Sequence, residues 1–386
     1  MRILFVSSSS GSRGGGETFL VYLGKALARR GHKVMLWVSD HGRMNEVAGR
    51  FEAFGTVQRA EYVNTYDRPR RSLDTFLDGT TPRRVAREWK ALKPDIVHLN
   101  KQNLEDGLDL LRGLRLLKCP TLCTIHMTQS AAYLGAKQAW LRDWVSRWVL
   151  RGYRSPMVTV SEPRKTDLEK FLGRRKGIVA ISNGVPIPPA MPEADRNRRR
   201  AELGLAEGNL AILAVGRMTA QKRPLRFLDL AEKIHTRVPE AKFLWIGDGP
   251  VAAEWDARAA SGGFGARRLG WRQDVPELLA SGDLLLHTAE YEGMPLAVLE
   301  AMAAGLPCAV SEGLYREMPF LDEGNSFRVP EEGDAWMEAL RDRGEIARRA
   351  KAAGQLAAAS FSTETMAAAY ERLYVECTGG GGTGRS

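Results

Sequence analysis

The stretch AEYEGMPLAVLEAMAAGLPCAVSE, residues 289–312, carries the clearest structural signal in the chain. It follows the apolar run DLLLHT and ends in a second one, LPCAVS, and both runs predict buried strands. Glu292 falls in the loop after the first run, and Glu300 falls about one and a half turns into a helix that begins near Leu296. A carboxylate among apolar helix residues is costly to bury alone, so Glu300 faces either the hydroxyls of a bound ribose or a structural Arg.

The same alternation of apolar runs and amphipathic segments extends outward over the whole chain. The runs are RILFVS, KVMLWV, DIVHLN, PTLCTI and MVTVS in the first half, and LAILAVG, AKFLWIGDG, DLLLHT and LPCAVS in the second. Between the first two runs, Phe19, Leu20, Leu23 and Leu27 share one face of a helix that ends at Gly31. Short apolar runs that alternate with helices predict β-α-β units and parallel sheets, so the fold class is α/β.

The chain is long enough for two hydrophobic cores, because 386 residues exceed what one core usually serves. Residues 182–200, SNGVPIPPAMPEADRNRRR, concentrate proline and polar side chains and predict the linker between two domains. We therefore expect two Rossmann-like domains that face each other across a cleft. Ligands of open parallel sheets bind at the carboxyl ends of the strands, so the loops at those ends should carry the chemistry.

Two further loops carry residues that suit phosphate binding. The glycine-rich loop 11–16 follows the first predicted strand, so its N–H groups form either a phosphate site or only a tight turn. In VGRMTAQKRP, Arg217 and Lys222 follow a strand and precede a helix that begins with proline. Two cations there either neutralise a diphosphate leaving group or belong to a solvated turn. Because the chain has no Asp-x-Asp pair to hold a divalent ion, we predict no metal site.

Eight segments resemble, in the right order, the landmarks of glycosyltransferase family 4. They are GGGE, TIHM, VSE, SNGV, VGRMTAQK, WIGDG, LGWRQDVPELL and EYEGMPLAVLEAMAAGLP, and the resemblance covers roughly residues 1–375. It implies the GT-B fold, a C-terminal helix that crosses back to the first domain, and sugar transfer with retention of anomeric configuration. The segment after LPCAVSE departs from the family pattern, because it lacks a second glycine cluster.

The resemblance also sets the expected domain bounds. We expect an acceptor domain at residues 1–183, a nucleotide-sugar donor domain at 184–361, a returning helix at 362–377 and a disordered tail at 378–386.

Residue roles in the second domain follow from the same resemblance. It implies that Arg217 and Lys222 hold the donor diphosphate and that Glu300 holds the nucleotide ribose. The sugar hydroxyls would be bound by Glu292 and by the backbone of Gly293, Met294 and Pro295.

In the first domain, the resemblance implies that Gly15 and Gly16 close over the donor phosphates. His126 would lie beside the transferred sugar, and it joins Arg217, Lys222 and Glu292 in the predicted catalytic set. His98, at the end of a predicted strand, is interpreted as structural. The donor is a substrate, so no cofactor is predicted.

Charge divides unevenly between the two halves. Residues 1–180 carry 32 Lys and Arg against 17 Asp and Glu, whereas residues 181–386 carry 24 against 29. The basic first half indicates an anionic partner, and we predict a glycan or lipid-linked acceptor or an anionic membrane surface rather than nucleic acid. The four scattered cysteines are typical of reduced thiols. Because the N-terminal apolar run is too short for an export signal, we expect a cytoplasmic protein, peripheral on the membrane.

The segment QAWLRDWVSRWVLRGYR, residues 138–154, spaces three tryptophans four residues apart with arginines between them. Such a helix suits a membrane interface, although helices at this place normally pack their tryptophans into the domain, and we expect the second arrangement. Basic clusters at residues 68–71 and 83–84 belong to the same half.

Three other functions stay open at this point. A nucleotide-sugar epimerase of the same fold would need acid and base carboxylates of its own, and a non-catalytic nucleotide-sugar-binding protein would not need the intact cations and acids. A dehydrogenase would use the glycine loop and Asp40, but it has no use for Glu292 and Glu300 at their spacing.

Overall fold

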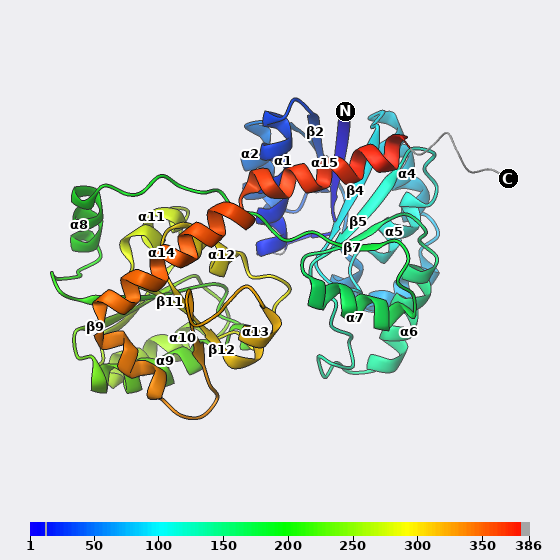
Figure 1. Ribbon diagram of the computed structural model, residues 1–386. Coiled ribbons are helices and arrows are strands. Elements are labelled where there is room, and N and C mark those ends of the chain that lie inside the picture. Colours follow the sequence, from blue (N-terminus) through cyan, green and yellow to red (C-terminus); the bar gives the residue numbers. More distant parts are fainter. Residues whose placement is uncertain (12–13, 380–386) are drawn as a thin grey trace. The chain divides into compact units, whose positions relative to one another are not determined.

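The protein is described by a computed structural model that covers residues 1–11 and 14–379. Its chain divides into two compact units, one formed by Met1–Gly184 with the segment from Thr363 onward, and the other by Val185–Ser362 (Figure 1). The loop residues Ser12 and Arg13 and most of the expected tail, residues 380–386, lie outside the described residues.

The first unit is built on a parallel sheet that has seven strands within the described residues, in the order β3-β2-β1-β4-β5-β6-β7. The strands are β1 (Arg2–Ser7), β2 (Lys33–Ser39), β3 (Thr56–Ala60), β4 (Ile96–Lys101), β5 (Thr121–Ile125), β6 (Met157–Thr159) and β7 (Ile178–Ala180). Read across the sheet, the strand numbers fall from β3 to β1 and then rise from β4 to β7. The strand order therefore reverses between β1 and β4.

Helices cover both faces of this sheet. They are α1 (Gly15–Arg29), α2 (Asn45–Glu52), α3 (Asp74–Leu77), α4 (Thr81–Ala91), α5 (Leu108–Leu114), α6 (Ala139–Arg151), α7 (Glu162–Leu172) and α15 (Thr363–Gly379), with short 3₁₀ turns η1 (Gly42–Met44), η2 (Thr65–Asp67) and η3 (Arg71–Leu73). Because side chains alternate along a strand, β1 sends Ile3 and Phe5 into a core with α1, α2 and α15. Leu4 and Val6 enter a second core with α4 to α7.

The C-terminal helix α15 belongs to the first unit, as the sequence predicted, and Figure 1 draws it in red beside α1. Its residues Met366, Tyr370 and Tyr374 are buried in the core that contains Phe19. The expected tail begins too early, because α15 continues through Thr378, whose hydroxyl donates to the Tyr374 carbonyl at 2.9 Å.

The second unit repeats the arrangement with a parallel sheet in the order β10-β9-β8-β11-β12-β13. Its strand order reverses between β8 and β11. Its strands are β8 (Leu210–Val215), β9 (Ala241–Ile246), β10 (Ala266–Gly270), β11 (Leu284–His287), β12 (Cys308–Ser311) and β13 (Ser326–Val329). Its helices are α8 (Glu193–Glu202), α9 (Pro224–Arg237), α10 (Ala252–Gly262), α11 (Val275–Ser281), α12 (Leu296–Ala303), α13 (Glu312–Glu317) and α14 (Arg343–Ser360), with η4 (Ala220–Lys222) and η5 (Ala335–Arg341).

The predicted linker is shorter than expected, because its second half folds as α8. The expectation over residues 182–200 was wrong from Glu193 onward, since the arginines of this segment have partners within the second unit. Arg200 donates to the Asp283 carboxylate at 3.0 Å and Arg196 to its other oxygen at 2.6 Å. These ion pairs fix α8 to the segment that leads into β11.

Candidate active site

The candidate site of the second unit lies at the carboxyl ends of β8 and β11. The two strands are parallel neighbours, and Leu284 of β11 pairs with Ile212 of β8. They flank the point at which the strand order reverses, which is where open α/β sheets leave a crevice for a ligand. The loop after β8 carries Arg217 and Lys222, and the loop after β11 carries Glu292.

Three hydrogen bonds join these two loops into one surface. The Thr288 hydroxyl donates to the Lys222 carbonyl at 2.9 Å, and the Glu290 amide donates to the Gln221 carbonyl at 2.9 Å. The Gln221 side chain in turn donates to the Tyr291 carbonyl at 2.8 Å. The backbone on both sides of Lys222 is therefore held against the segment that leads to Glu292.

Lys222 and Glu292 form an ion pair within this surface, Nζ to Oε1. The two side chains are only 18% and 11% exposed, and His287 Nε2 lies 3.5 Å from the same carboxylate oxygen. Burial alone would raise the pKa of Glu292, but the charge of Lys222 and the neighbouring His287 lower it to about 2. Glu292 is therefore an anion at neutral pH, and its partner is one of the two cations that the sequence predicted for a diphosphate.

Two glycines bring the loops after β8 and β9 into contact. A Cβ on Gly247, whose φ is +141°, would meet the Gly216 carbonyl oxygen at 2.0 Å. A Cβ on Gly249 would meet the Met218 backbone at 2.6 Å. Only glycine fits both places, so WIGDG positions the backbone around Arg217, whose own side chain is exposed.

Glu300 lies in the second turn of α12, as predicted, and is half-buried. Gly293, Met294 and Pro295 form the turn between Glu292 and that helix, and Met294 is buried. The structure thus brings Lys222 and Glu292 into contact. Glu300 lies in α12, the helix that follows the Glu292 loop.

In the first unit, the glycine loop meets the end of β4 at the reversal between β1 and β4. Asn100 Nδ2 donates to the Gly16 carbonyl at 3.0 Å, and Gln102 Nε2 donates to Glu17 at 3.2 Å. A Cβ on Gly16 would lie 2.0 Å from Gln102 Oε1, so a larger residue here would displace the Gln102 side chain. Gly15 begins α1 and is exposed. The predicted phosphate loop therefore lies at the carboxyl ends of β1 and β4.

His126 follows β5 at the same edge and is buried. Its Nε2 lies 2.8 Å from Asn100 Oδ1, and its ring contacts the edge of Phe19 at 4.8 Å between centroids. Burial lowers the pKa of His126 to about 4, so the ring is neutral at neutral pH. Asn100 therefore links His126 to the glycine loop.

His98 has the structural role that the sequence predicted. Its two ring nitrogens lie 2.7 Å from the Tyr374 hydroxyl and 2.8 Å from the Thr124 hydroxyl, all of them buried. Burial lowers the pKa of His98 to about 3, which keeps the ring neutral. The histidine thereby connects β4 to α15 and has no part in the ligand-binding edge.

A buried ion pair that no sequence motif indicated lies at the same end of the sheet. Lys101, at the end of β4, lies 3.3 Å from Asp106, and both side chains are at most 1% exposed. The Ser8 hydroxyl and the Gln102 amide donate to the same carboxylate. A lysine at the end of an otherwise buried strand, with an aspartate five residues on, is the signal that could have revealed it.

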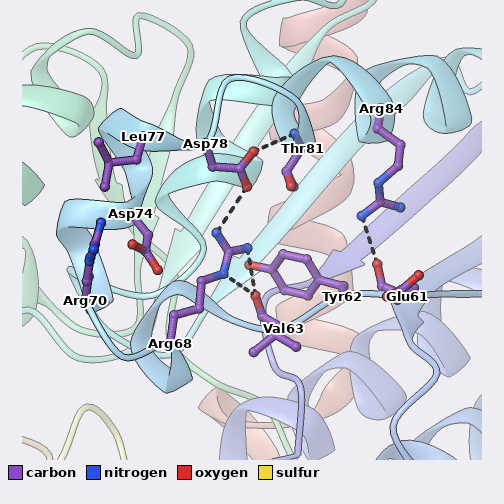
Figure 2. A pocket seen from close by; sticks show the side chains of 10 residues that line it. All are labelled: Glu61, Tyr62, Val63, Arg68, Arg70, Asp74, Leu77, Asp78, Thr81 and Arg84. Atoms are coloured by element: carbon purple, nitrogen blue, oxygen red, sulfur yellow. Dashed lines mark hydrogen bonds and ion pairs between the residues drawn. The ribbon is translucent and has the colours of Figure 1, made fainter.

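A pocket of about 590 Å³ lies beyond the end of β3 (Figure 2). Its lining residues are Glu61, Tyr62, Val63, Arg68, Arg70, Asp74, Leu77, Asp78, Thr81 and Arg84. Three arginines and three carboxylates stand among them, so the pocket offers both donors and acceptors. Such a lining suits a ligand rich in hydroxyl groups better than a simple anion.

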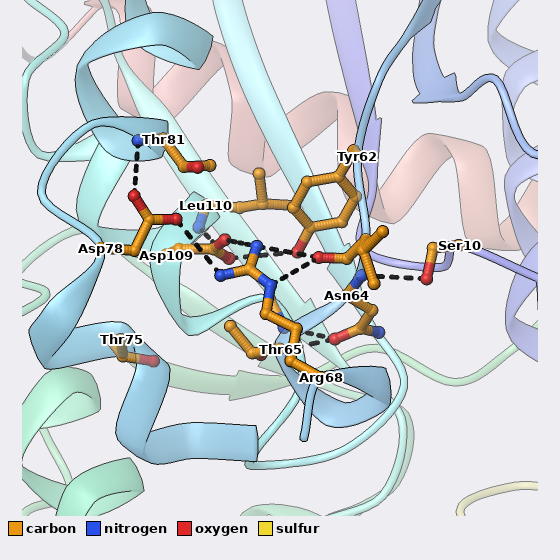
Figure 3. A network of polar contacts seen from close by, with 12 residues as sticks. Ser10, Tyr62, Asn64, Thr65, Arg68, Thr75, Asp78, Thr81, Asp109 and Leu110 are labelled. Carbon is orange, nitrogen blue, oxygen red and sulfur yellow. Dashed lines mark hydrogen bonds and ion pairs between the residues drawn. The ribbon is translucent and has the colours of Figure 1, made fainter. Parts of the chain in front are cut away.

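One wall of the pocket is a network around Arg68 (Figure 3). Arg68 donates to Asp109 at 2.5 Å and to Asp78 at 3.2 Å, and Tyr62 donates to Asp109 at 3.0 Å. Partial burial would raise the pKa of Asp78, but hydrogen bonds from Thr81 and its neighbour lower it to about 2.

The same wall is tied to the glycine-loop end of β1. The Asn64 amide donates to the Ser10 hydroxyl at 2.9 Å, and that hydroxyl donates to Asp67 at 2.8 Å. The loop after β3, which supplies part of the pocket lining, is therefore joined to the segment that leads from β1 into the predicted phosphate loop.

Within the part of the chain that the structure describes, no group of three or more His, Cys, Asp or Glu side chains is placed to hold a metal ion. The four cysteines are all free thiols.

Comparison with known families covers both units. Residues 13–187 match the family described as Glycosyltransferase Family 4, and residues 209–343 match Glycosyl transferases group 1. The two matches fall on the glycine-loop unit and on the unit that contains Lys222 and Glu292.

Individual curated relatives share about a third or less of their aligned residues with this chain. The chain is 27% identical over 262 residues to the Escherichia coli UDP-Gal:alpha-D-GlcNAc-diphosphoundecaprenol alpha-1,3-galactosyltransferase, a match that covers 66% of this chain and 64% of the relative. It is 32% identical over 260 residues to the Arabidopsis thaliana sulfoquinovosyl transferase SQD2, which covers 65% and 49% respectively. The chain thus spans about half to about two thirds of the length of these curated relatives.

Among solved structures, Anabaena HepE in complex with UDP superposes with a TM-score of 0.76 at 21% identity, over 96% of this chain and 99% of that one. At this identity the likeness concerns the fold, and it confirms the GT-B class of two Rossmann-like domains that the sequence predicted. The two family matches fall on both units, so the chain belongs to the group 1 and family 4 glycosyltransferases.

Proposed function

We propose that the protein transfers a hexose from a nucleoside diphosphate sugar to a glycan or lipid-linked acceptor, with retention of configuration and without a metal ion. The observation that carries the proposal is the Lys222–Glu292 ion pair at the strand-order reversal of the second unit. A cation held beside a carboxylate at this crevice suits a substrate that presents a diphosphate next to a sugar.

The chemistry follows from the charges of this site. The bond between the anomeric carbon and the diphosphate oxygen breaks, and negative charge grows on the leaving diphosphate. Lys222 and the exposed Arg217 on the same loop stabilise that charge. Such electrostatic stabilisation of the transition state is the largest single contribution to rate enhancement in many enzymes. The acceptor hydroxyl attacks the same face of the sugar and passes its proton to the departing phosphate oxygen, so the new bond retains the configuration.

Glu292 has a second role in the proposal. Because its pKa is about 2, it stays ionised and accepts hydrogen bonds from sugar hydroxyls. When the donor binds, a sugar hydroxyl takes the place of Lys222 at the Glu292 carboxylate, and Lys222 turns to the diphosphate. The backbone of Gly293, Met294 and Pro295 adds contacts to the sugar, and Glu300 takes the ribose hydroxyls.

For the first unit, we keep the roles that the family resemblance implies. Gly15 and Gly16 serve the donor phosphates, and His126 serves the transferred sugar. A neutral His126, held by Asn100 at 2.8 Å, is a hydrogen-bonding group rather than a cation.

The donor is proposed to be a UDP-hexose. In support, the galactosyltransferase relative is named for UDP-Gal, and HepE was solved with UDP and with UDP-glucose. The acceptor class is supported by the diphosphoundecaprenol acceptor in the name of the same relative and by the basic character of residues 1–180.

We propose that the acceptor enters the pocket beyond β3, because the loop after β3 is joined to the segment that leads into the glycine loop and the pocket offers donors and acceptors for hydroxyl groups. Replacing Arg70 by Ala, or Asp74 by Asn, should raise the KM for acceptor while leaving the KM for donor unchanged. An unchanged acceptor KM in both variants would place the acceptor elsewhere.

The function is tested by incubating the full chain with labelled UDP-hexoses and two acceptor panels, one of polyprenyl-diphosphate sugars and one of soluble oligosaccharides. Formation of a glycosylated product with an α-linkage, measured by NMR, supports the proposal. Conversion of the donor to an epimer without acceptor would instead establish the epimerase alternative, and nucleotide-sugar binding without any turnover would establish the non-catalytic one.

A further inference from the structure

The helix α6 presents two chemically different faces. Val145, Val149 and Leu150 are fully buried in the core of the first unit. Trp140, Trp144 and Trp148 are 75%, 56% and 50% exposed. The expectation that these tryptophans pack into the domain was therefore wrong, because the aliphatic residues of the helix already fill its buried face. Large aromatic side chains in a row on an exposed helix face mark a contact surface.

Two residues of α3 extend this row. The Phe76 ring lies 6.0 Å from the Trp144 ring and 5.1 Å from the Trp148 ring, measured between centroids. Phe76 is 40% exposed and Leu77 is 66% exposed. We call Phe76, Leu77, Trp140, Trp144 and Trp148 the aromatic surface. It joins segments that lie more than sixty residues apart in the sequence, so no periodicity in one segment could reveal it.

The segment that carries the three tryptophans is rich in positive charge. Residues 137–154 contain five Lys or Arg and a single acid, Asp143. That carboxylate is buried and accepts from the Ala131 and Ala132 amides at 2.7 and 3.1 Å, so it does not offset the cations at the surface. Arg142 is paired with Glu105, whereas Lys137 and Arg154 are exposed.

The two basic clusters of the sequence contribute less than expected. Arg68 is held by Asp78 and Asp109, and Arg84 is paired with Glu88 at 2.7 Å. Arg70 and Arg83 are exposed and keep their charge at the surface. Figure 2 shows Arg70, Asp74 and Leu77 together on one side of the pocket.

We propose that the aromatic surface docks on a bilayer that contains anionic lipid. Tryptophan and phenylalanine bury their rings at the boundary between headgroups and acyl chains, while the surrounding Lys and Arg contact anionic headgroups. A second copy of this chain is a poorer occupant, because a symmetric contact would bring the same basic segment against itself. None of the helices in the described residues could span a bilayer.

Docking on this surface has a consequence for the pocket beyond β3. Leu77 belongs both to the aromatic surface and to the lining of that pocket. The bilayer would therefore lie next to the pocket, where a lipid-linked acceptor presents its polar head. This consequence rests on the proposed function, whereas the docking itself does not.

Co-sedimentation with vesicles tests the docking independently of any activity. The full chain is mixed with vesicles of phosphatidylcholine alone and with vesicles that also contain phosphatidylglycerol, at salt concentrations from about 50 to about 500 mM. Binding is expected only with phosphatidylglycerol, and it should weaken as salt rises. Quenching of tryptophan fluorescence by brominated lipid reports that the rings enter the bilayer.

Two sets of variants separate the apolar part from the electrostatic part. Trp144→Ser with Trp148→Ser should lower the partition coefficient by roughly tenfold for each tryptophan removed, since each change removes a large apolar side chain from the contact. Lys137→Glu with Arg154→Glu should remove the salt dependence. Trp271→Ser, which deletes a tryptophan that is 46% exposed on the second unit, is the matched control and should bind as the wild type does.

All these positions are exposed, so the variants should melt at the wild-type temperature, which circular dichroism checks. If the wild type ignores anionic vesicles at low salt, or if the double tryptophan variant binds them as well as the wild type, the proposal is overturned. Self-association in sedimentation velocity that the tryptophan changes abolish would assign the surface to a second copy instead.

Discussion

Replacing Lys222 by Met separates a catalytic cation from a merely structural one. Lys222 and Glu292 are 18% and 11% exposed, so the substitution leaves an almost buried carboxylate without its cation. Removing one partner of a buried pair costs about 3 to 5 kcal/mol of unfolding free energy, and we expect the lower end because neither side chain is wholly buried. The rate of sugar transfer should fall by about 10² to 10³, as for loss of one preorganised charge from a developing anion.

The double variant Lys222→Met, Glu292→Gln removes both charges, keeps the length of the Glu292 side chain, and gives the decisive comparison with Lys222→Met. With no unpaired charge left, the Met and Gln pair should regain most of the lost stability in urea unfolding followed by fluorescence. Its transfer rate should stay at least about 10² below wild type, because the cation that faces the diphosphate is still missing. If activity returns together with stability, Lys222 only holds Glu292 in place and the proposed role in leaving-group stabilisation is refuted.

The pH dependence of this pair gives a further check. The folded pKa of Glu292, about 2, lies below its ordinary value of 4.5, so the stability contributed by the pair is present above pH 4.5. It is lost as pH falls from there through about 2. The stability difference between wild type and Lys222→Met should therefore shrink as pH falls and the unpaired carboxylate of the variant takes up a proton.

Three other predictions concern the donor site and the core. Transfer should persist in excess EDTA, since Arg217 and Lys222 supply the positive charge; activity that is lost in EDTA and restored by magnesium or manganese would contradict this. Arg217→Ala should lower the transfer rate by about 10² to 10³, and Glu300→Gln should chiefly weaken nucleotide binding in calorimetry; a fully active, folded Arg217→Ala would show that the site is misplaced. His98 and His126 have folded pKa values of about 3 and about 4 against an ordinary 6.5, so the unfolded chain takes up protons first and the first unit should lose stability as pH falls from 6.5 toward 3. His98→Gln, which can keep its hydrogen bonds to Tyr374 and Thr124, should flatten that slope in urea unfolding; an unchanged slope would show that His98 does not contribute to it.

The strands that the sequence predicted are the central ones, and the strands that it missed are the four edges. β3, β7, β10 and β13 lie at the ends of the two sheets. Edge strands are covered on fewer sides, and TVQRA and ARRLG accordingly carry polar side chains that are half-buried or exposed. A rule that searches for continuous apolar runs finds strands buried on both faces and overlooks strands of this kind.

The site shows the same division between local and distant information. The glycines, Arg217, Lys222, Glu292 and Glu300 could be singled out from local motifs. The contact between Lys222 and Glu292 could not be predicted from local motifs, because seventy residues separate the two and only the β8–β11 pairing brings their loops together. The aromatic surface depends in the same way on a contact between α3 and α6. Such contacts are set by strand order and helix packing, which no single motif encodes.

The most direct test of the central claim, that the protein binds a nucleoside diphosphate sugar as donor, is a thermal-shift measurement on the full chain in EDTA. The panel contains UDP, UDP-glucose, UDP-galactose, UDP-N-acetylglucosamine and GDP-mannose. A ligand at about 100 times its dissociation constant adds ~2.7 kcal/mol to the stability of the folded state, so a true donor should raise the melting temperature by several degrees. We predict that UDP and at least one UDP-hexose do so, and that Glu300→Gln reduces the shift. A panel in which no nucleotide or nucleotide sugar stabilises the wild-type protein would contradict the account.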